Sequence, residues 1–139
     1  MQILFIDTNI VVDLLLERKP FYKYAEKIFT LSDEGKLKLV VSALTIANTH
    51  YIISNLKSKE LAREAIAKFK VLVEIISLSD KIIELALSDV TFPDFEDGLQ
   101  YYSAIDANCA FIITRDLKDF KNSALPVMTA ESYIAGLKK

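Results

Sequence analysis

Short, strongly apolar runs alternate along this 139-residue chain with longer segments of helical periodicity. Runs rich in Val, Ile, Leu and Phe are typical of strands that are buried on both faces. Strands that alternate with helices favour a mostly parallel sheet with helices on both sides. The pattern therefore predicts a single domain over residues 1–139, an α/β fold built as a three-layer α/β/α sandwich around about five strands. We place the strands at residues 2–6, 37–41, 73–76, 110–114 and 127–128.

The segments between these runs carry the signals of helix boundaries. Ser, Thr and Asp residues are good helix caps, and proline suits the first position of a helix. Glycine after the last periodic residue is a common helix stop. We expect helices over residues 9–15, from Pro20 to the stop at Gly35, from Ser42 to about 55, from Ser58 to 69, from 80 to 88, from 94 to about 108, and a last one capped by Thr129.

The apolar spacing of the expected 42–55 helix indicates which side is buried. Leu44, Ala47 and Tyr51 recur at intervals of three and four residues. Residues at this spacing share one face of a helix. We therefore expect these three side chains to face the core.

The bulk composition excludes several classes of protein. A net charge of −2 gives no overall electrostatic attraction to nucleic acid, although a nuclease whose acids bind a metal remains compatible with it. A single cysteine excludes an intrachain disulfide and fits a reducing compartment. The first expected strand starts at residue 2, so we expect no signal peptide, and no apolar stretch approaches the roughly 18 residues of a membrane span. These features predict a cytoplasmic protein without a membrane segment.

Carboxylates follow two of the expected strands. Asp7 ends the first strand, and Asp116 follows the fourth. Because ligands collect outside the carboxyl ends of parallel strands, both side chains are candidate ligands of one cation. Hard oxygen ligands select Mg²⁺ or Mn²⁺, whereas one histidine and one cysteine are too few for zinc. Each residue alone has an ordinary alternative, a helix cap for Asp7 and a loop acid for Asp116.

An acidic run opens the helix expected from residue 94. Asp97 lies on the same stripe as Tyr101 and Ile105, so it points towards the core, where an unpaired carboxylate is costly. We therefore expect Asp97 to be the third ligand. Asp94 lies on nearly the same side, and Glu96 is rotated away by roughly a hundred degrees. Both remain further candidates, with favourable charge near a helix N-terminus as the alternative.

The residues around Asp116 suggest supporting roles. Thr114 could orient a metal ligand through its hydroxyl group. Arg115 and Lys118 are candidate phosphate contacts, with plain surface charge as the alternative. That alternative is favoured for Lys121.

These motifs together resemble the PIN domain family, to which the VapC toxins of VapBC toxin–antitoxin pairs belong. The resemblance rests on Phe5-Ile6-Asp7-Thr8-Asn9, Asp94-Phe95-Glu96-Asp97 and Thr114-Arg115-Asp116, and it covers nearly the whole chain. It implies an α/β/α sandwich that cleaves RNA with Mg²⁺ or Mn²⁺ held by three or four acids. Asp7, Asp97 and Asp116 match the first, third and fourth of these acids.

This chain departs from the family pattern at the second acid. The family usually has a glutamate on the helix after the second strand, where this sequence has Asn48. An asparagine offers an amide oxygen but no charge, so metal affinity should fall and a second metal becomes harder to hold. Glu96 is a candidate replacement, although its helix register disfavours it. An asparagine together with the acidic run is compatible with a subfamily of PIN domains.

The resemblance implies a metal-dependent endoribonuclease, with the toxin of a toxin–antitoxin pair as one form of it. The alternative is a catalytically weakened PIN-fold module that binds RNA or a protein partner, which Asn48 and the low basicity favour modestly. A phosphatase of the haloacid-dehalogenase type falls behind, because its second aspartate is replaced by Asn9. The family habit and a hydrophobic content of 52% favour a homodimer, and an antitoxin protein is the partner that the resemblance implies.

Overall fold

The computed structural model describes residues 1–137 and contains a five-stranded sheet with β1 at its centre. The strand order is β3-β2-β1-β4-β5, and every pairing among the described residues is parallel. The prediction of a parallel α/β sheet is therefore confirmed. The strands are β1 (Gln2–Ile6), β2 (Leu37–Ser42), β3 (Glu74–Ile76), β4 (Phe111–Ile113) and β5 (Val127–Met128).

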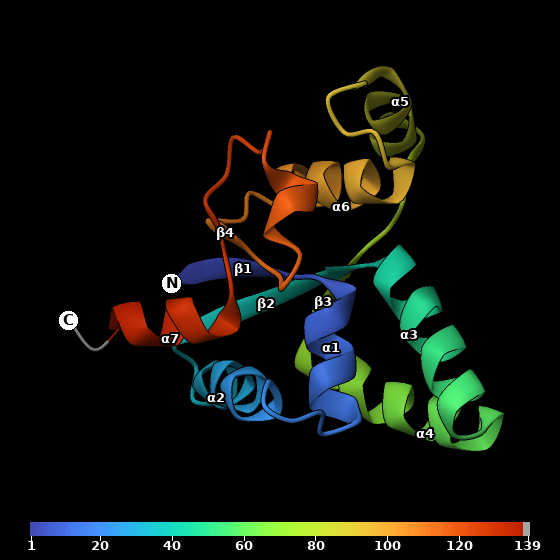
Figure 1. Ribbon diagram of the computed structural model, residues 1–139, viewed down its shortest axis with the longest axis vertical. Coiled ribbons are helices and arrows are strands. Elements are labelled where there is room, and N and C mark those ends of the chain that lie inside the picture. Colours follow the sequence, from blue (N-terminus) through green and yellow to red (C-terminus); the bar gives the residue numbers. More distant parts are fainter. Residues whose placement is uncertain (138–139) are drawn as a thin grey trace.

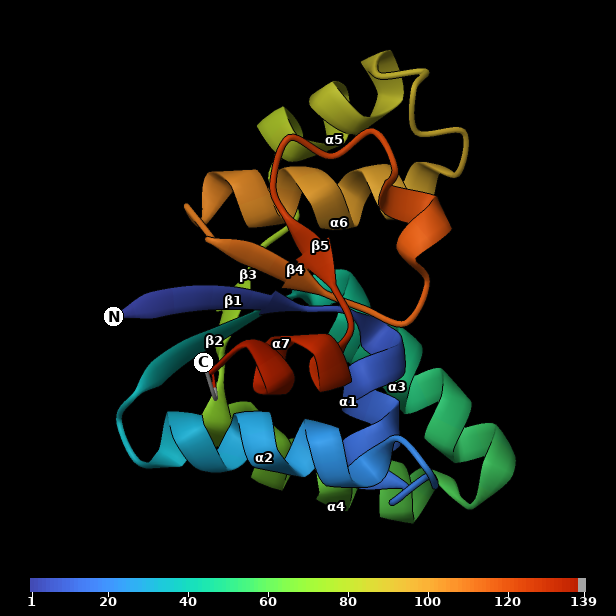
Figure 2. The same cartoon turned by 60° about the vertical axis from the view of Figure 1, so that its left-hand side comes forward.

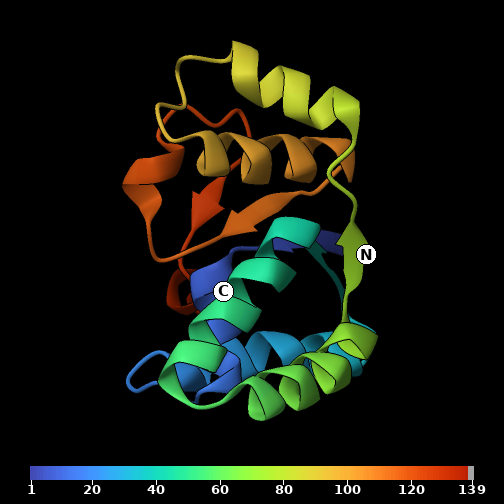
Figure 3. The ribbon, with the colours of Figure 1, turned by 90° about the vertical axis from the view of Figure 1, so that its right-hand side faces the viewer.

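Helices cover both faces of this sheet (Figure 1). α5 and α6 lie on one side, whereas α1, α2 and α7 lie on the other, and Figure 2 shows the same division from a second direction. α3 turns back into α4, and this pair lies on the side of α1 and α2 (Figure 3). No helix within residues 1–137 has both the length and the apolarity that crossing a membrane requires. The helices are α1 (Thr8–Leu15), α2 (Tyr22–Asp33), α3 (Ala43–Leu56), α4 (Lys59–Phe69), α5 (Asp80–Ser88), α6 (Phe95–Asp106) and α7 (Ala130–Leu137), with 3₁₀ turns at η1 (Lys70–Leu72) and η2 (Leu117–Phe120).

Alternate residues of the central strand contribute to two separate cores. Leu4 and Ile6 pack with Ile28 of α2 on one side of the sheet. Phe5 packs with Tyr101 of α6 on the other side. All three strand side chains have no exposed surface, and burying each contributes about 1.5–3 kcal/mol. A strand that is buried on both faces therefore appears in the sequence as a continuous apolar run.

The second helix begins later than its proline suggests. α2 starts at Tyr22, because the chain first makes a turn in which the Arg18 carbonyl accepts the N–H groups of Phe21 and Tyr22 at 3.0 and 2.8 Å. Pro20 lies inside this turn. The prediction that Pro20 opens the helix is wrong by this one turn.

The buried face of α3 also differs from the prediction. Thr45, Thr49 and Ile53 are buried, whereas Ala47 is exposed and Tyr51 has 68% of its surface exposed. The Thr45 hydroxyl lies 3.0 Å from the hydroxyl of Thr8, so the polar side of α3 faces the start of α1. Of the three residues predicted to face the core, Leu44 is partly buried and packs against the cluster of Ile82, Ala86 and Leu99. Apolar periodicity misses Thr45, because this residue is buried through hydrogen bonds.

The strand register brings the carboxyl ends of β1, β2 and β4 to one edge. Phe5 is paired with Val40 of β2 and with Ile112 of β4. The backbone N–H of Asp7 continues the ladder by donating to Ile113 at 3.0 Å. Side chains that follow these three strands therefore meet at the same rim.

Candidate active site

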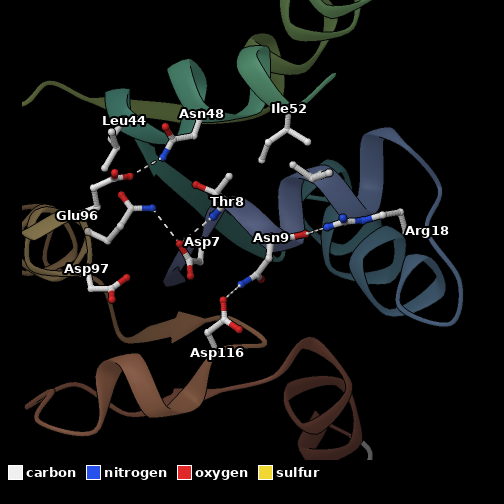
Figure 4. Close-up of a pocket in the computed structure, with 12 residues that line it drawn as sticks. Asp7, Thr8, Asn9, Arg18, Leu44, Asn48, Ile52, Glu96, Asp97 and Asp116 are labelled. Atoms are coloured by element: carbon white, nitrogen blue, oxygen red, sulfur yellow. Dashed lines mark hydrogen bonds between the residues drawn. The ribbon is translucent and has the colours of Figure 1, made fainter. Parts of the chain in front are cut away.

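A cavity of about 250 Å³ opens at this carboxyl edge (Figure 4). Acidic side chains reach it from three places, since Asp7 follows β1, Glu96 and Asp97 lie on α6, and Asp116 follows β4. The sequence prediction that Asp7, Asp97 and Asp116 approach one another is consistent with this lining. The residues that line the cavity are Asp7, Thr8, Asn9, Val12, Arg18, Leu44, Asn48, Ile52, Glu96, Asp97, Gln100 and Asp116.

Asp7 is held rigidly at the floor of the cavity. Its side chain has 8% of its surface exposed, and both carboxylate oxygens accept hydrogen bonds. Oδ1 accepts from the Thr8 N–H at 2.9 Å and from Gln100 Nε2 at 3.0 Å, and Oδ2 accepts from the Thr114 hydroxyl at 2.8 Å. Burial raises the pKa of Asp7, while these hydrogen bonds lower it and Asp116 raises it further, so that the pKa ends above its ordinary value. Asp7 thus caps α1 and also presents a carboxylate to the cavity.

Gln100 is a site residue that sequence reasoning missed. It is buried, donates to Thr45 Oγ1 at 2.7 Å as well as to Asp7, and accepts from the Ser42 hydroxyl. It therefore joins α6 to the ends of β1 and β2. Its signal in the sequence is its position three residues after Asp97, on the same side of the helix.

Asp97 experiences an excess of negative charge. Burial, followed by the charges of Asp119, Asp94, Asp7 and Asp116 in that order, raises its pKa to about 7. Asp119 is exposed, but its charge still reaches Asp97. A carboxylate in this surrounding is stabilised by any cation that binds between the acids.

Asn9 connects Asp116 to the rest of the rim. Its side-chain amide donates to Asp116 Oδ2 at 3.0 Å and to the Thr114 hydroxyl at 3.2 Å. Its amide oxygen accepts the Arg115 N–H at 3.2 Å. Each residue of the Asp7-Thr8-Asn9 motif therefore makes a defined contact at this edge.

Glu96 and Asn48 meet across the cavity. The Asn48 amide donates to Glu96 Oε1 at 3.1 Å, and Figure 4 shows the two side chains pointing towards each other from α3 and α6. The expectation that the helix register turns Glu96 away from the site is wrong, because the first turn of α6 lies at the cavity rim and both Glu96 and Asp97 reach it. Asp94 caps α6 by accepting the N–H groups of these two residues at 2.8 and 3.3 Å and lies outside the lining.

The two predicted phosphate contacts lie beside the cavity. The Arg115 guanidinium pairs with buried Asp13, through Nε at 2.9 Å from Oδ2 and Nη2 at 3.1 Å from Oδ1, and lies 4.0 Å from the centre of the Phe21 ring. Arg115 and Lys118 border a neighbouring hollow together with Asp116. Their role in phosphate binding stays a prediction.

The donor set of the cavity fits a hard divalent cation in kind and in charge. Its acids offer oxygen ligands only, which suit Mg²⁺ or Mn²⁺. Within residues 1–137 no three His, Cys, Asp or Glu side chains lie close enough together to hold an ion as they stand. Asp97 and Asp116 would therefore have to rotate towards Asp7 to share one, and for the exposed Asp116 this means giving up the hydrogen bond from the Asn9 amide.

Comparison with known proteins identifies the family to which this geometry corresponds. The sequence profile of the PIN domain family matches residues 4–118 of this chain. Ribonuclease VapC1 of Aquifex aeolicus is 30% identical in an alignment of 136 positions that covers 93% of this chain and 91% of that protein.

Solved structures agree in fold. VapBC2 of Rickettsia felis, crystallised with a DNA fragment of its promoter, has a TM-score of 0.69 at 22% identity and matches 91% of this chain and 97% of its own. VapC20 of Mycobacterium tuberculosis, a toxin that cleaves the sarcin–ricin loop, has a TM-score of 0.64 at 14% identity, with 78% and 86% covered. With its parallel sheet, its acid-lined rim and a family match over most of its length, this chain belongs to the PIN domain family.

Proposed function

We propose that this protein is a Mg²⁺- or Mn²⁺-dependent endoribonuclease of the VapC type, the toxin of a toxin–antitoxin pair. The observation that carries the proposal is the meeting of Asp7, Glu96, Asp97 and Asp116 around one cavity, where the pKa of Asp97 is raised to about 7. The similarity to a ribonuclease at 30% identity supports RNA as the substrate.

The residues of the cavity divide into ligands and positioning groups. Asp7, Asp97 and Asp116 would hold the cation, which when bound lowers the pKa of a water molecule and neutralises charge on the phosphate. Thr114 and Gln100 orient the Asp7 carboxylate through their hydrogen bonds. Asn9 holds Asp116 at the rim through its side-chain amide.

Removing the divalent cation should abolish cleavage. We expect the purified protein to cut a labelled single-stranded RNA in the presence of Mn²⁺, and to leave it intact when EDTA is in excess. Restoring Mn²⁺ should restore the cut, because the acids alone cannot neutralise the charge that develops on the phosphate. RNA binding without cleavage under all metal conditions would instead identify a catalytically weakened binding module.

Glu96 offers a second test of the metal site. It stands opposite Asn48, the position where the family resemblance expects an acid. Glu96→Gln should lower Mn²⁺ affinity roughly tenfold, since one negative charge leaves the cavity. Adding Asn48→Glu to that variant places a negative charge on α3, opposite the position that lost it. The double variant should therefore recover most of the Mn²⁺ affinity. Isothermal titration calorimetry with Mn²⁺ measures both steps.

A matched substitution guards against general effects of charge. Glu60 lies exposed in the first turn of α4, so Glu60→Gln should leave Mn²⁺ affinity unchanged. If Glu96→Gln behaves like this control, Glu96 does not contribute to the ion site.

We also propose an antitoxin protein as the partner, because VapBC complexes from Rickettsia felis and Klebsiella pneumoniae share the fold. The Klebsiella toxin–antitoxin complex has a TM-score of 0.67 at 22% identity, over 91% of this chain and 96% of its own. A homodimer stays a prediction, to be measured by light scattering.

A further inference from the structure

One end of the cavity carries positive charge. Arg18, in the turn after α1, lines the cavity together with the acids, and Figure 4 shows it on the opposite side from Glu96 and Asp97. A strand of RNA that reaches the acids must bring its own negative phosphates into this space. The acids repel those phosphates, and a net charge of −2 gives the chain no general attraction for them. A cation inside the lining is therefore placed where an RNA strand needs one.

A buried carboxylate orients the Arg18 side chain. Asp13 has no exposed surface, and its Oδ1 accepts from Arg18 Nε and lies 2.9 Å from Arg18 Nη2. Arg18 Nη2 also donates to the Asn9 carbonyl at 3.4 Å. These contacts leave the N–H groups on Nη1 without a hydrogen bond to any residue in 1–137. The guanidinium is thus held from one side and has donors left for a ligand.

Neutralising Asp13 does not require Arg18. Arg115 already binds both Asp13 oxygens, so the three side chains together carry one positive charge in excess. The side chain of Arg18 is 38% exposed, whereas Arg115 lies over the ring of Phe21 outside the cavity lining. The excess charge is therefore available on the Arg18 side.

We propose that Arg18 binds a backbone phosphate of the RNA, next to the phosphodiester that lies at the acids, and that Asp13 holds it in position. This inference rests on the proposed function of the cavity. Arginine suits the role because its planar fork can donate two parallel hydrogen bonds to one phosphate. The proposal assigns the RNA phosphate contact to Arg18 in preference to Arg115.

The test measures RNA binding without cleavage. In the Asp7→Asn background, the affinity for a fluorescent single-stranded RNA is followed by anisotropy over a series of salt concentrations. Arg18→Gln should weaken binding about tenfold and lower the slope of log affinity against log salt by about 0.7, the value for one phosphate contact on a single strand. Arg18→Lys should show the same salt slope as the background with intermediate affinity, since it keeps the charge and loses the fork.

Arg115→Gln tests the competing assignment of the phosphate contact. Arg63→Gln is the matched control, because it removes an exposed arginine of α4 that lies outside the cavity lining. We expect both substitutions to leave the RNA affinity and the salt slope unchanged. Thermal midpoints and Mn²⁺ affinity of the Arg18 variants should stay at their background values, since Arg115 keeps Asp13 paired. Unchanged binding in Arg18→Gln, or a larger loss in Arg115→Gln, overturns this inference alone. If the background protein binds no RNA, the proposed function fails with it.

Discussion

Asp7→Asn should reduce RNA cleavage by at least a hundredfold, a loss of about 3 kcal/mol or more in transition-state stabilisation. The substitution keeps the shape of the side chain and an oxygen that can accept from Thr8 and Gln100. It removes the negative charge that lies deepest in the cavity, which the other acids cannot replace from the rim. A Mn²⁺-dependent cleavage assay under single-turnover conditions measures the change.

The stability of this variant should not fall with its cleavage rate. The folded-state pKa of Asp7 is raised, so its stabilising contribution is complete below the ordinary pKa near 3.8 and is lost as the pH rises through the folded value. At neutral pH the metal-free protein therefore carries a cost that asparagine lacks. We expect Asp7→Asn to unfold in urea at the same or a higher midpoint than the unsubstituted protein at pH 7.5.

The combination of lost activity and kept stability identifies a functional residue. Asp106→Asn, at the exposed end of α6, is the control and should cleave at the original rate. An Asp7→Asn protein that retains more than about a tenth of the cleavage rate would show that Asp7 acts as a helix cap only.

Much of this fold could be predicted from local signals. The helix expected from residue 80 to 88 is observed over those residues, because Ser79 caps it and its apolar face is regular. Asp94 and Ser42 cap the helices that follow them, as polar side chains before apolar segments predict. The buried face of α3 could not be predicted this way, since Thr45 is buried through partners on other elements.

The part of the candidate site that follows the strand ends could be predicted from the sequence. Residues that follow parallel strands meet at one rim, which is why Asp7 and Asp116 could be paired from the sequence. The contacts of Gln100 and of the pair Asn48–Glu96 depend on how α3 and α6 lie across the cavity, and an isolated helical wheel contains no information on that. Asp13 was missed for the same reason, because its partner Arg115 is distant along the chain.

Asp13 is expected to contribute strongly to the stability of the fold. Its carboxylate is buried in α1 and joins Arg18, in the turn before α2, to Arg115, in the segment after β4. A buried ion pair need not stabilise a fold more than apolar residues would, but removing one partner leaves the other charges without compensation. Without the Asp13 carboxylate, the guanidinium groups of Arg18 and Arg115 would lie close together and repel each other.

We expect Asp13→Asn to lower the free energy of unfolding by about 2–4 kcal/mol. The value stays below the top of the range for buried pairs, because the side chains of Arg18 and Arg115 are 38% and 29% exposed and regain some hydration. Urea unfolding followed by circular dichroism gives this difference, and the melting temperature should fall by roughly 6–12 °C. Asp33→Asn, on the exposed end of α2, should change the free energy of unfolding by less than about 0.5 kcal/mol. Equal stability of the two variants would mean that the arginines do not need the buried carboxylate, and Arg18 would then lack the support that positions it in the cavity.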